Sequence, residues 1–181
     1  MSSSPIPLPP YILPHGNWKL LLKDKCVLFD TNAIIAASDC KAGGLIEELA
    51  TAGSYPAYSH PVYIELLRTE KQVVQAERIN FLVTNNFIPF PLSQEEIKIA
   101  TKLQALLYKL GCRPSPADIY LGAALARHRG DLLYLLTANT KDFPHPVYNR
   151  EGYIVLQDAN HTQVFTLTKL SAETQNSLLS N

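Results

Sequence analysis

The chain has 181 residues, of which 46% are hydrophobic and 18% are charged. This length and composition are typical of one globular domain with a substantial buried core. The formal net charge is zero, so no overall positive field attracts nucleic acid or anionic lipid. Any polyanion must therefore be bound by local basic residues or through metal ions.

Cysteine usage and the first residues narrow the class of protein further. Cys26, Cys40 and Cys112 stand far apart, with no CxxC motif and no adjacent cysteine–histidine pair, which argues against a disulfide framework and against a zinc site. The opening segment MSSSPIPLPPYILPHGNWKLLL has no basic region before its apolar residues, and prolines interrupt these. We expect neither a signal peptide nor a membrane span. We therefore expect a soluble, cytoplasmic protein.

The chain divides into three predicted parts. Residues 1–24 are expected to form a Pro-rich N-terminal arm, because PIPLPPYILP favours an extended, polyproline-like path. Residues 25–170 form the predicted domain, and residues 171–181 a loose polar C-terminal tail. Trp18 and the leucines near it are candidates to dock onto the domain. No internal repeat and no second domain is visible.

Within the predicted domain, strand and helix patterns alternate. Strand patterns occur at residues 26–30, 55–59, 87–92, 132–139, 153–158 and 163–170. Helical patterns occur at residues 31–39, 45–53, 59–70, 73–85, 93–111 and 115–130. Strands that alternate with helices predict crossover connections and parallel pairing. The predicted fold is α/β, a three-layer α/β/α sandwich with a central, mostly parallel sheet.

Signals at the element ends support these boundaries. Ser93 with Glu96 three residues later is a capping-box pattern, and Gly111 follows that helix. Ser59 is a candidate N-cap, and Pro61 lies in the first turn, where its missing N–H costs little. The nearly uniform apolar run LLYLLTAN suits a strand covered on both faces.

Acidic residues stand where an α/β fold forms its sites. Asp30 ends the apolar run CVLFD, and Asn139 ends LLYLLTAN. Sites in open parallel sheets form outside the carboxyl ends of the strands, so we expect both residues at one edge. Glu65, Asp118 and Asp142 are candidates to join them. Taken singly, each also has a structural explanation. Glu65 would be a solvated helix residue, Asp118 a favourable charge at a helix N-terminus, and Asp142 a turn residue.

Four segments resemble, in the same order, the four acidic motifs of the PIN-domain family. They are VLFDTNAII, SHPVYIELLR, SPADIYLGAALARHRG and LLYLLTANTKDF. The family includes ribonuclease toxins of the VapC type, and the resemblance spans residues 25–160. It implies a PIN-like fold and a metal-dependent endoribonuclease that hydrolyses phosphodiester bonds in RNA.

The resemblance also implies roles for single residues. Asp30, Glu65 and Asp118 match the acidic triad. The fourth motif often carries Asp where this chain has Asn139, so either Asp142 supplies the missing charge or Asn139 ligates through its carbonyl. The implied metal ligands are Asp30, Glu65, Asp118 and Asp142, and the implied catalytic set adds Asn139. The implied cofactor is one or two Mg²⁺ or Mn²⁺ ions.

The chemistry explains why carboxylates would gather in this way. Hard divalent cations prefer oxygen ligands, and they activate water and stabilise the charge that develops in phosphodiester hydrolysis. Carboxylates clustered without a cation raise each other's pKa. Candidate substrate-binding residues lie beside the acidic motifs: Asn32, Arg68, Arg113, Thr137 and Lys141. A structural hydroxyl explains Thr137 about as well.

The expected partners are RNA and, from the resemblance alone, a small antitoxin protein and a second copy of the chain in a homodimer. One alternative is a non-catalytic PIN-like domain that binds RNA or protein. A haloacid-dehalogenase-like phosphatase fits poorly, because Asn32 and Ile34 occupy the positions of the second acid and the hydroxyl in its D-x-D-x-T pattern. A structural α/β domain without a site would require four coincidences.

Overall fold

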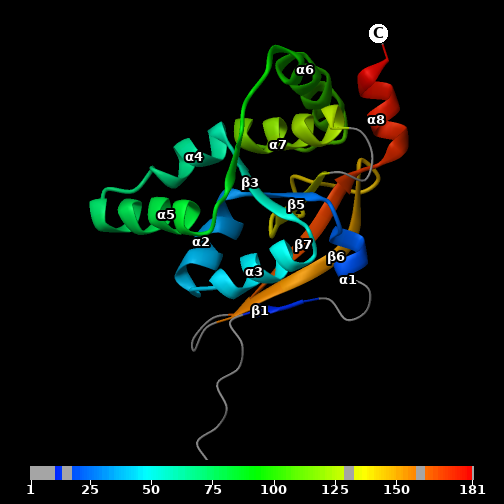
Figure 1. The fold of residues 1–181 in the computed structure, drawn as a ribbon. Coiled ribbons are helices and arrows are strands. Elements are labelled where there is room, and N and C mark those ends of the chain that lie inside the picture. The colour runs from blue at the N-terminus through cyan, green and yellow to red at the C-terminus, as the bar shows by residue number, and fades with distance from the viewer. Residues whose placement is uncertain (1–10, 14–17, 129–132, 158–161, 181) are drawn as a thin grey trace, which may run out of the picture.

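The computed structural model of the chain describes residues 11–13, 18–128, 133–157 and 162–180. These residues form a mixed α/β fold with a seven-stranded sheet and eight helices (Figure 1). The strands are β1 (Tyr11–Ile12), β2 (Cys26–Phe29), β3 (Tyr55–Ser59), β4 (Ile88–Phe90), β5 (Leu133–Thr137), β6 (Tyr148–Gln157) and β7 (Thr162–Leu170). The helices are α1 (Trp18–Leu22), α2 (Thr31–Asp39), α3 (Gly43–Thr51), α4 (His60–Leu66), α5 (Gln72–Thr84), α6 (Gln94–Lys109), α7 (Pro116–Arg127) and α8 (Ala172–Leu179). Across the described ranges, no helix has both the length and the apolar character needed to cross a bilayer.

The sheet is parallel in its centre and antiparallel on one side. Its strand order is β1-β6-β7-β5-β2-β3-β4. Strands β5, β2, β3 and β4 pair in parallel, as the alternation of strands and helices predicts. Strands β7, β6 and β1 are antiparallel to their neighbours, which the sequence does not predict. Only residues 158–161 connect β6 to β7, and a parallel crossover needs a dozen residues or more.

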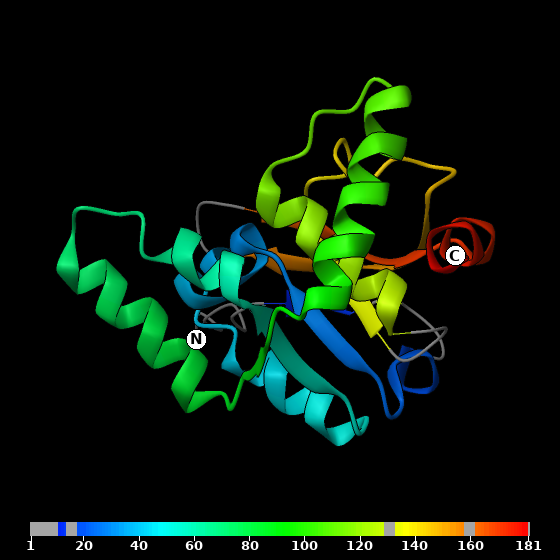
Figure 2. The same ribbon diagram turned by 90° about the horizontal axis from the view of Figure 1, so that it is seen from above.

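The helices pack against this sheet and against each other. In Figure 1, α6 and α7 lie above the strands and α3 lies below β3 and β5, and Figure 2 shows α6 crossing in front of the sheet. Helix α7 contacts α6, β5 and β7, while α2 contacts β2 and β5. Every residue of β5 is buried, as its uniform apolar run predicts. The core therefore surrounds β2 and β5, the two strands that end at the acidic motifs.

Two predicted helix starts are confirmed. The Ser93 hydroxyl accepts the Glu96 N–H at 3.3 Å, and Glu96 Oε2 accepts the Ser93 N–H at 2.7 Å, which completes the capping box of α6. Ser59 is the N-cap of α4, its hydroxyl accepting the Val62 N–H at 3.5 Å. Local sequence alone specifies these ends, because each cap satisfies a backbone donor within its own first turn.

The two chain ends take more part in the fold than predicted. Within the predicted arm, β1 pairs with β6 and α1 buries Leu22 completely, while residues 1–10 and 14–17 lie outside the described ranges. The predicted loose tail contains helix α8, which buries Leu178. Lys102 of α6 donates to the Ser180 carbonyl at 2.8 Å. The expectation of a loose tail is therefore wrong, because a polar helix can dock with one buried leucine and a few backbone contacts.

Close packing under α7 depends on one glycine. A Cβ built on Gly122 would lie 2.6 Å from Leu103 Cδ2 and even closer to the Tyr148 hydroxyl. Glycine inside a helix is destabilising by roughly 0.5–1 kcal/mol relative to alanine, so the local propensity opposes this choice. The gain is that α7, whose first turn carries Asp118, can approach β6 closely.

We expect the substitution Gly122→Ala to lower the free energy of unfolding by about 1–3 kcal/mol, because the added methyl group overpacks the interface with Leu103 and Tyr148. Urea unfolding followed by circular dichroism measures this loss. The exposed α6 substitution Thr101→Ala serves as a control and should change stability by no more than about 0.5 kcal/mol.

A second variant tests the cause of that loss. The Tyr148 hydroxyl has no hydrogen-bond partner among the described residues, so Tyr148→Phe alone should be close to neutral. Combined with Gly122→Ala, it should recover part of the lost stability, since it removes one of the two clashing groups. Strictly additive effects in the double variant would contradict this explanation.

Candidate active site

The register of the two central strands brings the ends of two acidic motifs together. Phe29 of β2 is paired with Leu136 of β5, and the Asp30 N–H donates to the Leu136 carbonyl at 3.1 Å. Asp30 therefore lies next to Thr137, immediately beyond the parallel pairing. This is the sheet edge at which the sequence predicts a site.

The carboxylate of Asp30 is buried and held at both oxygens. Only 4% of the residue is exposed. Its Oδ1 accepts the Ala33 N–H at 2.7 Å, so Asp30 is the N-cap of α2. Its Oδ2 accepts a hydrogen bond from the hydroxyl of Thr137, which is completely buried. The same Thr137 hydroxyl accepts the Asn139 N–H at 2.9 Å and therefore fixes Asp30 and the start of the next loop together.

Burial, with a smaller contribution from repulsion by Asp118, raises the pKa of Asp30 to about 6, even though hydrogen bonds from Thr137, Ala33 and the backbone of Asn32 act in the opposite direction. Neutral hydrogen-bond donors thus compensate only in part for the loss of water around the carboxylate. A buried acid with a strongly raised pKa beside a second acid is a frequent feature of functional sites.

Glu65 reaches the site from α4. Its Oε2 accepts a hydrogen bond of 2.5 Å from the hydroxyl of Thr31, the first residue of α2. The side chain is half-buried. Of the two residues that follow β2, Asp30 is thus itself an acid of the site, and Thr31 orients a second acid, Glu65.

Asp118 reaches the site from the first turn of α7. Its Oδ2 accepts hydrogen bonds from the Ser115 N–H at 3.1 Å and the Ser115 hydroxyl at 2.8 Å, and the Ser115 hydroxyl in turn accepts the Asp118 N–H at 3.2 Å. Burial raises the pKa of Asp118, and Asp142 and Glu65 raise it further by repulsion, while Ser115 lowers it. Asp118 therefore takes part in capping its helix, and its carboxylate is also repelled by other acids of the site.

The fourth acidic motif contributes a linked pair of side chains. Asn139 Nδ2 donates to Asp142 Oδ2 at 2.8 Å, and the Asp142 N–H donates to Asn139 Oδ1 at 3.4 Å. Asn139 lines the same pocket as Asp30 and Asp118, whereas Asp142 is not among the lining residues. Asp142 thus acts on the site through its charge and through Asn139.

One pocket of about 200 Å³ joins these groups. Its lining residues are Asp30, Thr31, Asn32, Glu65, Ser115, Ala117, Asp118, Leu121 and Asn139. Three predicted acids from β2, α4 and α7 meet there, together with Asn139 and Asn32. This convergence of segments that lie far apart in the sequence is the main structural finding at the site.

The other predicted substrate contacts lie outside the pocket lining. Arg68, Arg113 and Lys141 are exposed and lie on the chain next to Glu65, Ser115 and Asn139. The Arg113 guanidinium stacks 4.4 Å from the centre of the Tyr108 ring and so lies against the C-terminal end of α6. The buried Thr137 hydroxyl serves Asp30 and Asn139, so its observed contacts are structural.

The donor set fits a hard divalent cation in chemical type. Three carboxylates and the amides of Asn32 and Asn139 line a common pocket, and oxygen ligands of this kind suit Mg²⁺ and Mn²⁺. Burial is the main cause of the raised pKa of Asp30 and Asp118, and repulsion from neighbouring acids adds to it; a cation would relieve that repulsion. Among the described residues, no three acidic, histidine or cysteine side chains already stand close enough to hold an ion. Binding would therefore require the carboxylates to turn towards each other.

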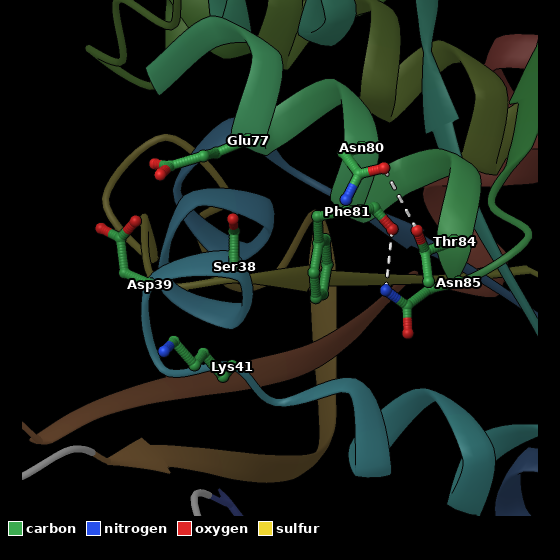
Figure 3. Close-up of a pocket in the computed structure, with 8 residues that line it drawn as sticks. All are labelled: Ser38, Asp39, Lys41, Glu77, Asn80, Phe81, Thr84 and Asn85. Atoms are coloured by element: carbon green, nitrogen blue, oxygen red, sulfur yellow. Dashed lines mark hydrogen bonds between the residues drawn. The ribbon is translucent and has the colours of Figure 1, made fainter. Parts of the chain in front are cut away.

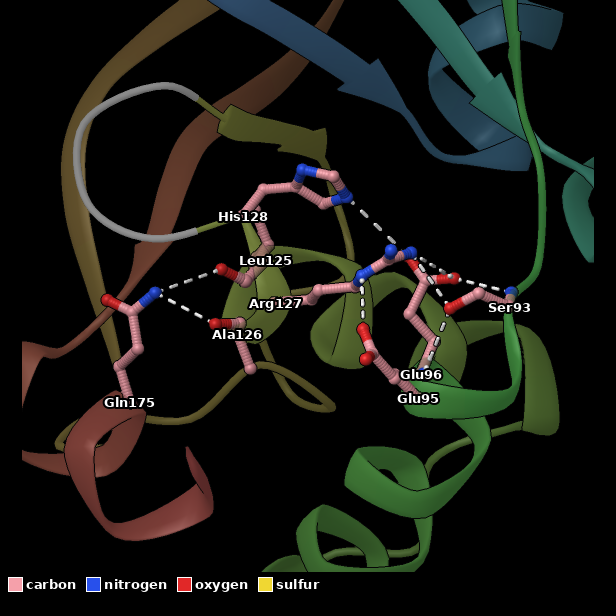
Figure 4. A network of polar contacts seen from close by, with 8 residues as sticks. All are labelled: Ser93, Glu95, Glu96, Leu125, Ala126, Arg127, His128 and Gln175. Carbon is pink, nitrogen blue, oxygen red and sulfur yellow. Dashed lines mark hydrogen bonds and ion pairs between the residues drawn. The ribbon is translucent and has the colours of Figure 1, made fainter. Parts of the chain in front are cut away.

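A second buried acid shows what a structural carboxylate looks like in this fold (Figure 4). Glu96 is 1% exposed, but it completes the capping box of α6 and lies 3.8 Å from Arg127 Nη1. His128 Nε2 is also 3.8 Å away; burial lowers the pKa of this histidine. The Glu96 carboxylate thus has the cation Arg127 and the Ser93 backbone N–H as neighbours. The neighbours of the Asp30 carboxylate are a hydroxyl, a backbone N–H and further acids.

Comparisons with protein-family models, with curated proteins and with solved structures find no significant match to this chain.

The sequence does not show which hydroxyl group holds which acid. Nothing in it pairs Thr31 with Glu65, and the family resemblance gives Ser115 no role toward Asp118. A local signal existed for Ser115, because Ser-x-x-Asp at a helix start is a capping-box pattern. No local signal could reveal Thr31, since its partner lies 34 positions along the chain.

The raised pKa of Asp30 predicts a pH-dependent cost of burying it. Because the folded-state pKa of about 6 exceeds the ordinary value of about 4, the folded protein binds this proton more tightly than the unfolded chain. Stability from this group is complete below about pH 4 and is lost as the pH rises through about 6. Without metal, Asp30→Asn should therefore be more stable than the natural protein at pH 7, by up to about 3 kcal/mol.

Urea unfolding in EDTA between pH 4 and pH 7.5 measures this difference. The advantage of Asp30→Asn should be small at pH 4 and should grow towards pH 7. The exposed substitution Glu47→Gln is the matched control and should show no comparable trend. An advantage that stays constant over this range would show that burial of the charge is not its origin.

Proposed function

We propose that this protein is a metal-dependent endoribonuclease with a PIN-like, three-layer α/β/α fold, which hydrolyses phosphodiester bonds in RNA. The observation that carries the proposal is the meeting of Asp30, Glu65 and Asp118 with Asn139 in one pocket at the carboxyl ends of β2 and β5. The order of the four acidic motifs along the chain supports the same reading.

In this proposal, Asp30 and Asp118 are the principal ligands of Mg²⁺ or Mn²⁺, and Glu65 either ligates through water or orients the attacking water. The bound cation would supply a more nucleophilic water and positive charge for the phosphoryl oxygens. The hydroxyls of Thr137, Thr31 and Ser115 would orient Asp30, Glu65 and Asp118, respectively. Asp142 would add charge behind Asn139.

The substrate would be held by neighbouring loops. Arg68, Arg113 and Lys141 are exposed cations next in sequence to the acidic motifs, and cations of this kind contact phosphates. Asn32 lines the pocket itself and would contact the nucleotide at the cut. By the family resemblance, we further propose that the protein is the cytoplasmic toxin of a toxin–antitoxin pair, with a small antitoxin protein and a second copy of the chain as partners.

A non-catalytic PIN-like module that binds RNA or protein is the second candidate. Two observations favour it: Asn139 stands where the family often has an acid, and the three carboxylates are engaged with hydroxyls rather than gathered around a common point. The two candidates differ in whether metal-dependent cutting occurs.

We expect purified protein to cut a mixed pool of structured and single-stranded RNAs in Mg²⁺ or Mn²⁺ but not in EDTA. Asp30→Asn and Asp118→Asn should each lower the rate at least about 100-fold, since both remove a charge that the transition state requires. The exposed α6 substitution Glu95→Gln is the control and should cut like the natural protein. Equal cutting by all variants would reveal a contaminant and favour the second candidate.

Metal binding can be tested without any substrate. Saturating Mn²⁺ at about 100 times its dissociation constant should stabilise the protein by roughly 2.7 kcal/mol, which corresponds to a rise of about 5–10 °C in Tm for a chain of this size. Scanning calorimetry with and without EDTA measures the rise. Glu95→Gln should show the full rise and Asp118→Asn much less. A rise of equal size in Asp118→Asn would place the ion elsewhere.

A further inference from the structure

The end of α4, the helix that carries Glu65, is held by side chains of another helix. The last carbonyls of a helix find no N–H partner within it. Here the Leu66 carbonyl accepts a hydrogen bond from Arg78 Nη1 at 3.3 Å, and the Leu67 carbonyl accepts one from Gln75 Nε2 at 2.8 Å. Both donors belong to α5. The two helices are thus joined at the residues that directly follow Glu65.

The Gln75 amide also closes the turn that follows α4. Its Nε2 donates to the Thr69 carbonyl at 2.7 Å as well, so both hydrogens of the amide are used. The two carbonyls that it binds, those of Leu67 and Thr69, flank Arg68. The Arg68 N–H in turn donates to the Glu65 carbonyl at 3.0 Å. Glu65 and Arg68 therefore belong to one backbone unit, which side chains of α5 hold in place.

Helix α5 can support this unit because its C-terminal half is anchored in the core. Within α5, only Phe81 and Leu82 are buried. Figure 3 shows the Phe81 ring between α5 and the C-terminal end of α2, and the ring centre lies 5.8 Å from that of Phe87. Gln75 and Arg78 precede Phe81 by six and three residues on the same helix. Their side chains therefore start from a backbone that is fixed against the core.

Helix α4 itself is too short to fix the position of Glu65. It has seven residues, of which Val62 and Leu66 are buried, and isolated helices of this length are not stable in water. Glu65 meets the candidate site through the hydrogen bond of 2.5 Å from the Thr31 hydroxyl. A small shift of the C-terminal end of α4 would lengthen this bond and withdraw the carboxylate from the pocket.

We propose that Gln75 and Arg78 are positioning residues of the carboxylate pocket, which hold the end of α4 so that Glu65 reaches Thr31. Neither residue lines the pocket, so their effect passes through Glu65 and through the backbone of Arg68. This inference rests on the proposed function for the chemistry that Glu65 performs. It does not rest on it for the position of Glu65, which can be measured without metal or RNA.

The test measures the position of Glu65 through its energetic coupling to Thr31. The natural protein, Thr31→Val, Glu65→Ala and the double variant are unfolded in urea with EDTA, and the cycle gives the coupling as a factor in the unfolding equilibrium constant. In the natural protein this factor should be about 10-fold, as expected for a hydrogen bond to a charged group. The same cycle is then measured with Gln75→Glu added to all four proteins.

Gln75→Glu should remove most of the coupling, because glutamate has nearly the same shape but no N–H groups to donate. Gln75→Lys restores a donor and should retain most of the coupling. Arg78→Met is a second variant that should weaken the coupling, and it provides the comparison if Gln75→Glu does not fold. The matched control is Gln104→Glu on α6, where the amide donates to the Tyr108 hydroxyl at 3.1 Å. This control should leave the coupling unchanged.

A cleavage assay adds a second measurement. Gln75→Glu should lower kcat for RNA about 10- to 100-fold, since a misplaced catalytic group is costly, and Gln75→Lys should recover most of this loss. Coupling that is absent from the natural protein or unchanged in Gln75→Glu and Arg78→Met, or an unchanged kcat, would overturn the inference. Lost coupling in a protein that cuts no RNA would refute only the nuclease. Cutting with undisturbed coupling would refute only the role of Gln75 and Arg78.

Discussion

The buried carboxylate of Asp30 is the constraint on which the candidate site depends. It ends the central strand β2, caps α2 through the Ala33 N–H and receives the hydroxyl of Thr137 from the neighbouring strand. Its position is therefore fixed by the parallel pairing of β2 with β5. The same burial is the main reason why its pKa is raised to about 6. At neutral pH the folded protein therefore holds a charged carboxylate in surroundings that favour the neutral form. Natural proteins accept such local instability mainly where function requires it.

Comparison of Asp30 with Glu96 shows that burial alone does not define this site. Both acids are at the start of a helix and both are almost inaccessible. Glu96 lies beside Arg127 and completes a capping box (Figure 4), so its charge is balanced within the protein. The charged neighbour that acts on Asp30 is another acid, Asp118. A buried carboxylate balanced by a cation stabilises structure, whereas one that faces further carboxylates is suited to bind a cation from solution.

The sequence predicted those parts of the fold that short-range chemistry determines. The capping box of Ser93 and the N-cap of Ser59 each lie within one helical turn, and the apolar run of β5 records burial directly. The position of Asp30 was predictable because strand ends in a parallel sheet share an edge. The antiparallel side of the sheet, the docking of α8 and the pairing of Thr31 with Glu65 were not, because each depends on contacts between distant segments. The need for a glycine at position 122 likewise becomes evident only when α7 lies against Tyr148.

The hydroxyl groups around the acids give the site its character. Thr137, Thr31 and Ser115 each donate to a different carboxylate, and a hydroxyl donor orients an acid without neutralising it. The acids therefore keep their negative charge, and the exposed cations Arg68, Arg113 and Lys141 stand outside the pocket lining. Such a pocket repels a phosphodiester until a divalent cation balances the carboxylates. Under the proposed function, binding of the cation and of an RNA backbone should accordingly be coupled, each strengthening the other.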